Sequence, residues 1–352
     1  MSSRNLVKLH TIDPLHDRRW DDLVARHPRS SAFHQRGWIE SLKLTYGYEP
    51  FVLTSTPEGK PLENGLLLCL VASWITGTRA VSLPFADHCE PLLNLANEEH
   101  PFADWLWKEC DHQRWKYVEL RPLSWHEKSC NQLSRSQSYC LHTLDLTGSS
   151  EEVFHGFHKN SIQRRISRAE GEGLDYETGC SGQLLDEFYG LMLKTRRRHQ
   201  LPPQPRAWFR NLAARLGDKL EIRVARQGHI PIAALLSLRH RTSVIYKYGC
   251  SDETFHRFGA VPFLFWKLIQ ESKALGAEEF DFGRSDLEQQ GLIIFKERFG
   301  AKRRTLTYFR YPMSKPSNTY LDWSARAGRK VISLLPDAVL PLAGRILYKH
   351  VG

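Results

Sequence analysis

The chemistry open to this sequence depends on three side chains, two carboxylates and one ammonium group: Asp87, Asp281 and Lys296. Asp87 lies in a turn beside His88 and Glu90, and a carboxylate in such an acid-rich loop can accept a proton from an amine or a hydroxyl. A loop aspartate can equally serve as a turn or cap residue. The first interpretation predicts a general base, or a group that orients the acceptor.

Asp281 and Lys296 stand close together in the sequence. Asp281 alternates with two phenylalanines on a predicted strand, Phe280 to Arg284, so its carboxylate points to the face opposite those aromatic rings. There it either forms a structural ion pair with Arg284 or orients an acceptor in a cleft. Lys296 follows a polar loop, and its ammonium group can offset the charge of a phosphate or a developing oxyanion. The alternative is an exposed lysine among neighbouring basic residues.

Two arginine clusters are candidate sites for an anionic substrate. Arg164, Arg165 and Arg168 fall within one turn of a predicted helix and project to one side, because positions i, i+3 and i+4 are neighbours. They form either a solvated basic face or a substrate-binding surface. The second cluster, Arg196 to Arg198, precedes a proline-rich loop with aromatic residues, which either stack a base or sugar ring or pin the loop to the core.

A further anion site is predicted where a loop meets a helix. The segment His256 to Pro262 places Arg257, Gly259 and Ala260 before an aromatic helix, and the free amides of a helix N-terminus favour an anion. The competing interpretation is an ordinary glycine turn with a proline that starts the helix.

The elements that must position these residues occur twice along the chain. A predicted hairpin, Phe51–Thr54 with Leu66–Ser73, recurs as Leu220–Ala225 with Ile232–Leu238. A helix precedes each hairpin, and a third strand, an aromatic helix and a strand ending in arginine follow it. Pro61 and Pro231, like Arg121 and Arg284, are separated by nearly equal intervals, which indicates a duplicated unit of about 165 residues.

Each predicted unit is an α+β arrangement with a mixed sheet, because helices and strands do not alternate strictly. Small polar residues near Thr147 suggest the boundary, so the predicted domains are residues 1–147 and 148–312. Residues 313–352 form a tail in which basic residues alternate with short apolar runs. This pattern predicts two short amphipathic helices, which either pack on the body or lie at a membrane interface.

Composition limits the class of protein. The 352 residues are 41% hydrophobic and carry a net charge of +10, which indicates a globular chain of about two domains with a preference for anionic partners. We expect a cytoplasmic protein, because there is no targeting segment and no run of roughly 18 apolar residues. The seven scattered cysteines lack a C-x-x-C pair, so we expect free thiols and no metal site. The chain has neither a P-loop nor a G-x-S-x-G elbow.

Several motifs, taken in order, resemble the FemAB-like branch of the GNAT acyltransferases. They are Leu83 to Leu92, Arg164 to Gly173, Thr195 to Pro205, Phe280 to Ser285 and Phe295 to Gly300. The resemblance covers roughly residues 30 to 312. It implies two tandem GNAT-like domains with mixed β-sheets, followed by the amphipathic tail. It also implies transfer of an acyl or aminoacyl group to an amine or hydroxyl of an anionic cell-envelope precursor or polysaccharide.

The resemblance also assigns roles to the candidate residues. It places Lys296 at the active cleft, the helix with Arg164, Arg165 and Arg168 against an anionic substrate, and the pyrophosphate of coenzyme A at Gly259. Fem-type peptidyltransferases take their acyl group from aminoacyl-tRNA, but this chain has no long charged, heptad-like insertion for their helical arm.

We therefore predict acyl-CoA as the donor, with aminoacyl-tRNA and a peptidoglycan precursor as the alternative pair of substrates. A non-catalytic basic protein that binds nucleic acid or anionic polysaccharide is the alternative of a different class. The tail adds a predicted peripheral contact with the inner face of the membrane.

Overall fold

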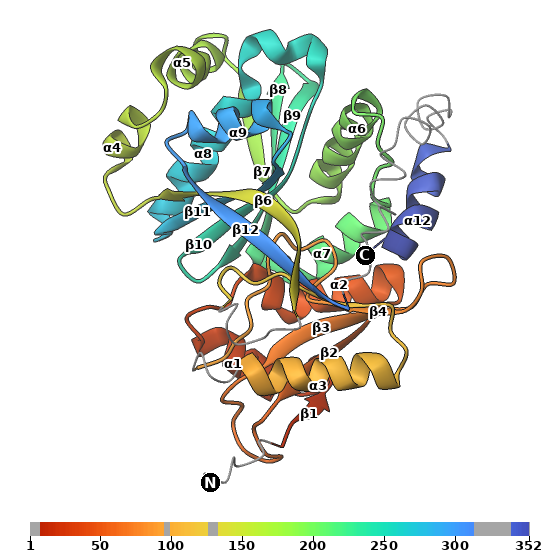
Figure 1. The fold of residues 1–352 in the computed structure, drawn as a ribbon. Helices are drawn as coiled ribbons and strands as arrows, with labels where there is room; N and C mark the ends of the chain where they lie inside the picture. The colour runs from red at the N-terminus through yellow and green to blue at the C-terminus, as the bar shows by residue number, and fades with distance from the viewer. Residues whose placement is uncertain (1–7, 95–98, 126–132, 313–338, 352) are drawn as a thin grey trace. The chain divides into compact units, whose positions relative to one another are not determined.

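The computed structural model describes residues 8–94, 99–125, 133–312 and 339–351 (Figure 1). The chain forms two compact units. Unit 1 comprises residues 1–138, 306–319 and 348–352, and unit 2 comprises residues 139–305 and 320–347. The domain limits predicted at residues 147 and 312 were drawn from the repeat in the sequence, and they stay a prediction. In the predicted tail, residues 313–338 lie outside the described residues, and α12 (Leu340–Val351) is the described helix.

Unit 1 is a mixed sheet with a helix packed on it. Its strands, in spatial order, are β1 (His10–Ile12), β2 (Glu49–Thr54), β3 (Leu66–Val71), β4 (Arg79–Val81), β5 (Val118–Leu120) and the end of β12 (Lys302–Tyr311). Its helices are α1 (Arg19–Arg26), α2 (Arg36–Tyr46) and α3 (Glu99–His112). The pair β4 and β5 is parallel and the other pairs are antiparallel. Phe102 and Leu106 of α3 pack on buried strand residues such as Leu53 and Leu68.

Unit 2 repeats this arrangement with longer elements. Its strands, in spatial order, are β7 (Asp175–Gly179), β8 (Leu220–Gln227), β9 (Ile230–His240), β10 (Ser243–Ser251), β11 (Glu279–Asp286) and β6 (Ser134–Asp145). Its helices are α4 (Ser150–His155), α5 (Arg164–Gly171), α6 (Gly182–Arg198), α7 (Arg206–Leu216), α8 (Ala260–Ala274) and α9 (Gln290–Glu297). Here β10 and β11 are the parallel pair.

The duplicated order of strands confirms the mixed-sheet fold that the sequence predicted. In both units a hairpin is followed by a third antiparallel strand, a helix and a parallel strand. The last strand of each sheet, however, comes from the other half of the sequence. β6 follows β5 along the chain but pairs with β11, and β12 follows β11 but pairs with β5.

Local sequence explains where the helices near the predicted site begin. α4 starts with a capping box, because Ser149 Oγ accepts a hydrogen bond from Glu152 N (3.1 Å) and the Glu152 carboxylate accepts one from Ser149 N (2.7 Å). Downstream, the rings of Phe265, Phe282 and Phe299 pack with centroids 5.3–5.5 Å apart. This aromatic core fixes α8 and the residues after α9 against β11.

Candidate active site

The parallel strands of unit 2 separate soon after they meet. β10 and β11 pair over Ser243–Ile245 and Glu279–Asp281, and each then has an irregularity of register toward its other neighbour. β10 continues to Ser251 and β11 to Asp286, and within the described residues no further pairing joins the two strands. We call residues 246–251 of β10 and 282–286 of β11 the strand split. Here the two strands do not pair with each other, whereas β10 stays paired with β9 and β11 with β6.

Lys296 closes the bulge of β11 at this split. Its side chain is 2% exposed, and its ammonium group donates hydrogen bonds to the carbonyl oxygens of Gly283 (2.7 Å) and Arg284 (3.1 Å). The alternative of an exposed lysine is therefore wrong. A buried ammonium group held by two carbonyls is a fixed positive charge, which can act on an anion or oxyanion nearby.

Asp281 and Arg284 lie on the same bulge. The Asp281 carboxylate is buried and accepts a hydrogen bond from Gly283 N (2.7 Å), and Gly283 has a φ of +68°. The Arg284 guanidinium lies over the Tyr139 ring, 4.2 Å from its centroid. The structure thus brings Asp281, Arg284 and Lys296 together around one irregularity of β11. Their catalytic and binding roles stay predictions.

Gly259 allows a close approach of two elements at the start of α8. It has a φ of +73°, and a Cβ at this position would lie 2.4 Å from the carbonyl oxygen of Arg165. Any other residue would be strained by both the backbone angle and this contact. Because the first amides of a helix have no intrahelical acceptor, the N–H groups of Ala260 and Val261 are available to an anion.

Cations from two helices, α5 and α6, lie beside this helix start. Arg198, the last residue of α6, lies with its Nη1 3.4 Å from His256 Nε2, and Ser251 Oγ lies 2.9 Å from the same nitrogen. Burial lowers the pKa of His256, and the positive charges of Arg198 and Arg165 lower it further, with Glu253 acting in the opposite direction. Arg198 and Arg165 thus bring positive charge to this helix start. Such charge favours a phosphate group.

The predicted basic helix face is present in α5. Arg164, Arg165 and Arg168 are exposed, whereas Ile162 and Ile166 are buried as their spacing requires. Arg168 donates a hydrogen bond to the carbonyl oxygen of Arg257 (3.3 Å), so it also ties α5 to the loop before α8. The Arg257 guanidinium is exposed and lies over the Phe258 ring, 4.8 Å from its centroid.

Sequence reasoning did not assign Arg198 and His256 to the anion site at the start of α8. Both had a signal, because Arg198 ends an arginine run and His256 opens the segment before Gly259. What the sequence could not show is that the end of α6 lies beside that segment. Thr195 of α6 joins β10 through bonds to the backbone of Ser251, which brings the two together.

Asp87 belongs to unit 1, whereas the other candidates belong to unit 2. It is largely buried, and its carbonyl oxygen accepts a hydrogen bond from the Tyr308 hydroxyl (2.6 Å). Arg121 holds the same loop by donating to the carbonyl oxygens of Leu83 (2.7 Å) and Ala86 (3.2 Å). Convergence of Asp87 with the residues of unit 2 stays a prediction.

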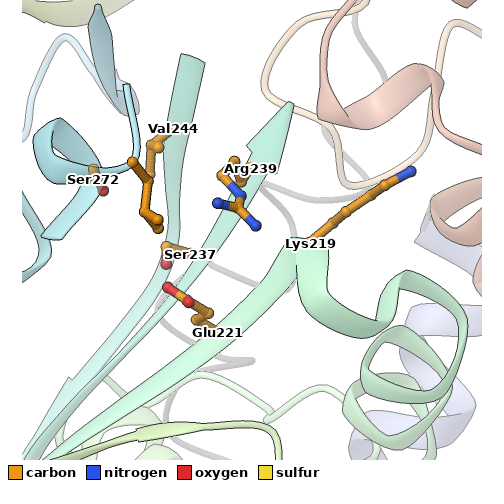
Figure 2. A pocket seen from close by; sticks show the side chains of 7 residues that line it. Lys219, Glu221, Ser237, Arg239, Val244 and Ser272 are labelled. Carbon is orange, nitrogen blue, oxygen red and sulfur yellow. The ribbon is translucent and has the colours of Figure 1, made fainter. Parts of the chain in front are cut away.

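A pocket of unit 2 lies away from the strand split. Figure 2 shows it near the start of β10, where Val244 lies, whereas the split occupies the other end of that strand. It is lined by Lys219, Glu221, Ser237, Arg239, Val244, Ser272 and Leu275. None of the predicted site residues lines this pocket.

The described residues contain neither a cluster of metal ligands nor a membrane-spanning helix. Within the part of the chain that the structure describes, no group of three or more His, Cys, Asp or Glu side chains could hold a metal ion. Of the described helices, none combines the length and apolar character needed to cross a membrane.

Comparisons with known proteins identify the type of domain. Residues 156–291 match the family model described as an acetyltransferase (GNAT) domain. This match includes α5, the strand split and the start of α8, and it ends before Lys296. No curated protein matches the chain.

Solved structures share the fold of most of the chain. A structure of FemX is 13% identical, with a TM-score of 0.69, and the match covers 86% of this chain and 97% of FemX. The C-terminal domain of a putative lysylphosphatidylglycerol synthetase from Agrobacterium fabrum is 16% identical, with a TM-score of 0.55, covering 83% of this chain and 90% of that one.

A tandem GNAT protein from the clavulanic acid biosynthesis pathway is 10% identical, with a TM-score of 0.53, covering 86% of this chain and 98% of that one. These structures share the predicted tandem GNAT-like fold. The matched GNAT domain supports the predicted acyltransferase class.

Proposed function

We propose that this chain, an acyltransferase with a GNAT domain and a FemX-like fold, moves an acyl group from acyl-CoA to an amine or hydroxyl of a cell-envelope precursor or polysaccharide. The observation that carries the proposal is the start of α8. There, free helix amides, an obligatory glycine and the cations Arg165 and Arg198 occur together beside the strand split. A pyrophosphate group is the chemistry that this arrangement accommodates.

The reacting groups are proposed to lie along the split itself. A thioester that lies in the strand split between β10 and β11 has its carbonyl near the bulge of β11, where Lys296 supplies a fixed positive charge to the developing oxyanion. Asp281, on the same bulge, orients the acceptor. Asp87 is proposed as an additional proton acceptor from unit 1.

The acceptor is proposed to be anionic. Arg164 and Arg165 present two exposed guanidinium groups on α5, and Arg165 lies at the loop before α8. Arg284 adds a third guanidinium at the bulge of β11. One structural relative is a domain of a putative lysylphosphatidylglycerol synthetase, which supports an acceptor from the cell envelope. N- and O-transfer are both compatible with this set of side chains.

Aminoacyl-tRNA is the second candidate donor, and the similarity to FemX favours it. A tRNA-dependent enzyme must bind many phosphates, so its activity should fall steeply with added salt. Acyl-CoA presents few phosphates, so the salt dependence of its use should be shallow. The two donors are therefore separable by one series of rates.

The experiment supplies the purified protein with labelled acetyl-CoA, labelled longer-chain acyl-CoAs or labelled aminoacyl-tRNA, each with an envelope-precursor acceptor. We expect transfer from acyl-CoA that is insensitive to ribonuclease. Arg165→Gln should weaken acyl-CoA binding several-fold, whereas Arg210→Gln, an exposed arginine of α7 outside the site, should not change it. Transfer from the charged tRNA alone would refute the proposed donor.

The predicted membrane contact remains a proposal about the tail. In α12, Leu342 and Ile346 are exposed at 56% and 54%, and Arg345 and Lys349 share that solvent-facing side. Tyr348 and His350 are buried, and the Tyr348 carbonyl accepts a hydrogen bond from the Tyr48 hydroxyl (2.7 Å). We propose that the helix packs by its buried side and leaves its exposed apolar and basic side for the inner face of the membrane.

A further inference from the structure

Two buried polar side chains of unit 2 lack the partners that such groups normally have. His142 on β6 is 0% exposed and Ser285 on β11 is 1% exposed. Among the described residues, neither ring nitrogen of His142 has a hydrogen-bond partner, and the Ser285 hydroxyl has none either. Buried polar groups are nearly always satisfied, and leaving one unsatisfied is costly. An arrangement that is costly for folding suggests a role in function.

The register of the sheet places these two side chains on one face. Cys140 of β6 is paired with Ser285, and His142 lies two residues beyond Cys140, so Ser285 and His142 point to the same side of the sheet. They are diagonal neighbours, a spacing that a long side chain can bridge. His142 thereby lies opposite the bulge of β11, whose carbonyl oxygens hold Lys296.

Helix α9 and the start of β12 supply the charges that face His142. They are Lys296, Glu297 and Arg303. Burial lowers the pKa of His142 and the Lys296 charge lowers it further, whereas Glu297 acts in the opposite direction. At neutral pH the imidazole is therefore uncharged, and one of its nitrogens can accept a proton.

Glu297 connects this buried imidazole with solvent. Its Oε1 lies 3.9 Å from His142 Nε2, and its side chain is 42% exposed. This separation is too long for a direct hydrogen bond and suits a bridging water molecule. A proton accepted by His142 thus has a route outward that does not pass the bulge of β11.

We propose that Ser285, His142 and Glu297 form a proton relay, in which His142 receives the proton of the acceptor nucleophile through the Ser285 hydroxyl and passes it toward solvent through Glu297. This inference rests on the proposed function. The nucleophile's nitrogen or oxygen forms a bond to the acyl carbon, and the bond from that carbon to the thiolate sulfur of coenzyme A breaks. The nucleophile loses one proton to the relay, and the departing thiolate takes one proton from solvent.

The test compares pH profiles of kcat/KM, with acetyl-CoA or a longer-chain acyl-CoA as donor, for the wild type and four variants. His142→Gln should lower the rate at neutral pH at least tenfold and abolish the acidic limb that His142 protonation causes. Glu297→Gln should move that limb to lower pH, because it removes the anion that favours the protonated imidazole. Ser285→Ala should lower the rate and leave the midpoint of the limb in place.

His240→Gln is the matched control. His240 is also a histidine of unit 2 whose pKa is lowered by burial, but it lies at the end of β9 and faces Arg241 and Lys219. Its replacement should leave the profile as in the wild type. A purely structural role of His142 predicts a uniform loss of rate in the variants and no movement of the limb in Glu297→Gln, and that result would overturn the relay.

A second measurement does not require turnover. The titration of the His142 imidazole, followed by NMR of labelled protein, should shift to lower pH in Glu297→Gln. An imidazole indifferent to this change would refute the relay even if the enzyme is active. If no acyl-CoA is used while the imidazole responds as expected, the proposed donor fails and the relay is supported. Thermal unfolding of His142→Leu gives a third criterion, since loss of an unpartnered polar group should leave Tm unchanged or raise it.

Discussion

Helices α3 and α8 occupy the same position in the two duplicated sheets, but their first turns differ in charge. The first turn of α3 contains Glu99, a buried carboxylate, whereas the first turn of α8 contains no acidic residue. A helix N-terminus carries a partial positive charge. In unit 1 that charge is offset from within the chain, whereas in unit 2 the cations Arg165 and Arg198 add to it.

The two units also differ at the pairs formed by the exchanged strands, β5 with β12 in unit 1 and β11 with β6 in unit 2. In unit 1, Arg310 of β12 and Arg121 both pair with Glu119 of β5, at 2.6 and 2.9 Å. Burial raises the pKa of Glu119, but the two arginines outweigh it and the net shift is downward. In unit 2 the corresponding pair leaves His142 and Ser285 without partners among the described residues. At this strand pair unit 1 thus holds a buried ion-pair network, whereas unit 2 holds two buried polar groups without such partners.

The largest effect should come from a buried cation of unit 2. Lys296→Ala should lower the rate at least about tenfold, equal to about 1.4 kcal/mol of transition-state stabilisation, and should destabilise unit 2 because the carbonyls of Gly283 and Arg284 lose their donor. Turnover per folded molecule and thermal unfolding measure the two losses separately.

Arg79 of unit 1 is the matched control for Lys296. It is also 2% exposed, and it donates hydrogen bonds to the carbonyl oxygens of His350 (2.9 Å) and Gly77 (3.3 Å). Arg79→Met should lower stability and leave turnover per folded molecule unchanged. Full activity of folded Lys296→Ala would remove this lysine from the mechanism and with it the functional difference between the units.

The two ends of α8 provide the next test. Gly259→Ala should cost at least the roughly 1–2 kcal/mol of a left-handed backbone, increased by the contact with the Arg165 carbonyl, and should weaken acyl-CoA binding. Gly276 follows the same helix with a φ of +83° and nothing within 4 Å of an added Cβ, so Gly276→Ala should show the backbone cost alone. Equal losses of affinity in both variants would contradict an anion site at Gly259.

The sequence predicted the repeated hairpins and helices because their signals are local. Periodicity and turn residues identify β2, β3, β8 and β9, and isoleucine spacing identifies the buried side of α5. The exchange of β6 and β12 between the sheets was not predictable, because strand pairing depends on distant segments.

The same limit applies to the site. Lys296 was found by resemblance, yet its burial depends on how α9 packs against β11. His142 has no neighbouring motif in the sequence, and its importance emerges only from the missing partners around it. Local patterns therefore give the elements and several candidate residues, whereas the charge balance between elements requires the fold.

Acid should affect unit 2 before unit 1. The pKa of His240 is lowered from 6.5 to about 4, mainly by burial and then by the charges of Arg241 and Lys219. Between these values the unfolded chain binds more protons, so stability falls as pH drops from about 6.5 toward 4, by roughly 1–3 kcal/mol. Burial also lowers the pKa of three further histidines of unit 2, His142, His199 and His256, and of one of unit 1, His350.

Hydrogen exchange between pH 7 and pH 4 can distinguish the peptides of the two units. We expect unit 2 to lose protection first, and His240→Gln to reduce its loss. The predicted difference in acid sensitivity would be contradicted if the peptides of both units lost protection at the same pH and His240→Gln left this pH dependence unchanged.

The smallest effect should come from Glu99, because a single charge at a helix N-terminus contributes little to stability. Glu99→Gln removes the charge that offsets the N-terminus of α3, which should cost under about 1 kcal/mol of stability and should not alter acyl-CoA affinity. Denaturant unfolding and titration with acetyl-CoA measure the two quantities. The amides at the start of α3 become more attractive to anions once the carboxylate charge is removed. A second acetyl-CoA site in this variant would show that Glu99 alone prevents the donor from binding at the N-terminus of α3. A weakened first site would instead place unit 1 in the binding of the donor, and the proposed difference between the N-termini of α3 and α8 would fail.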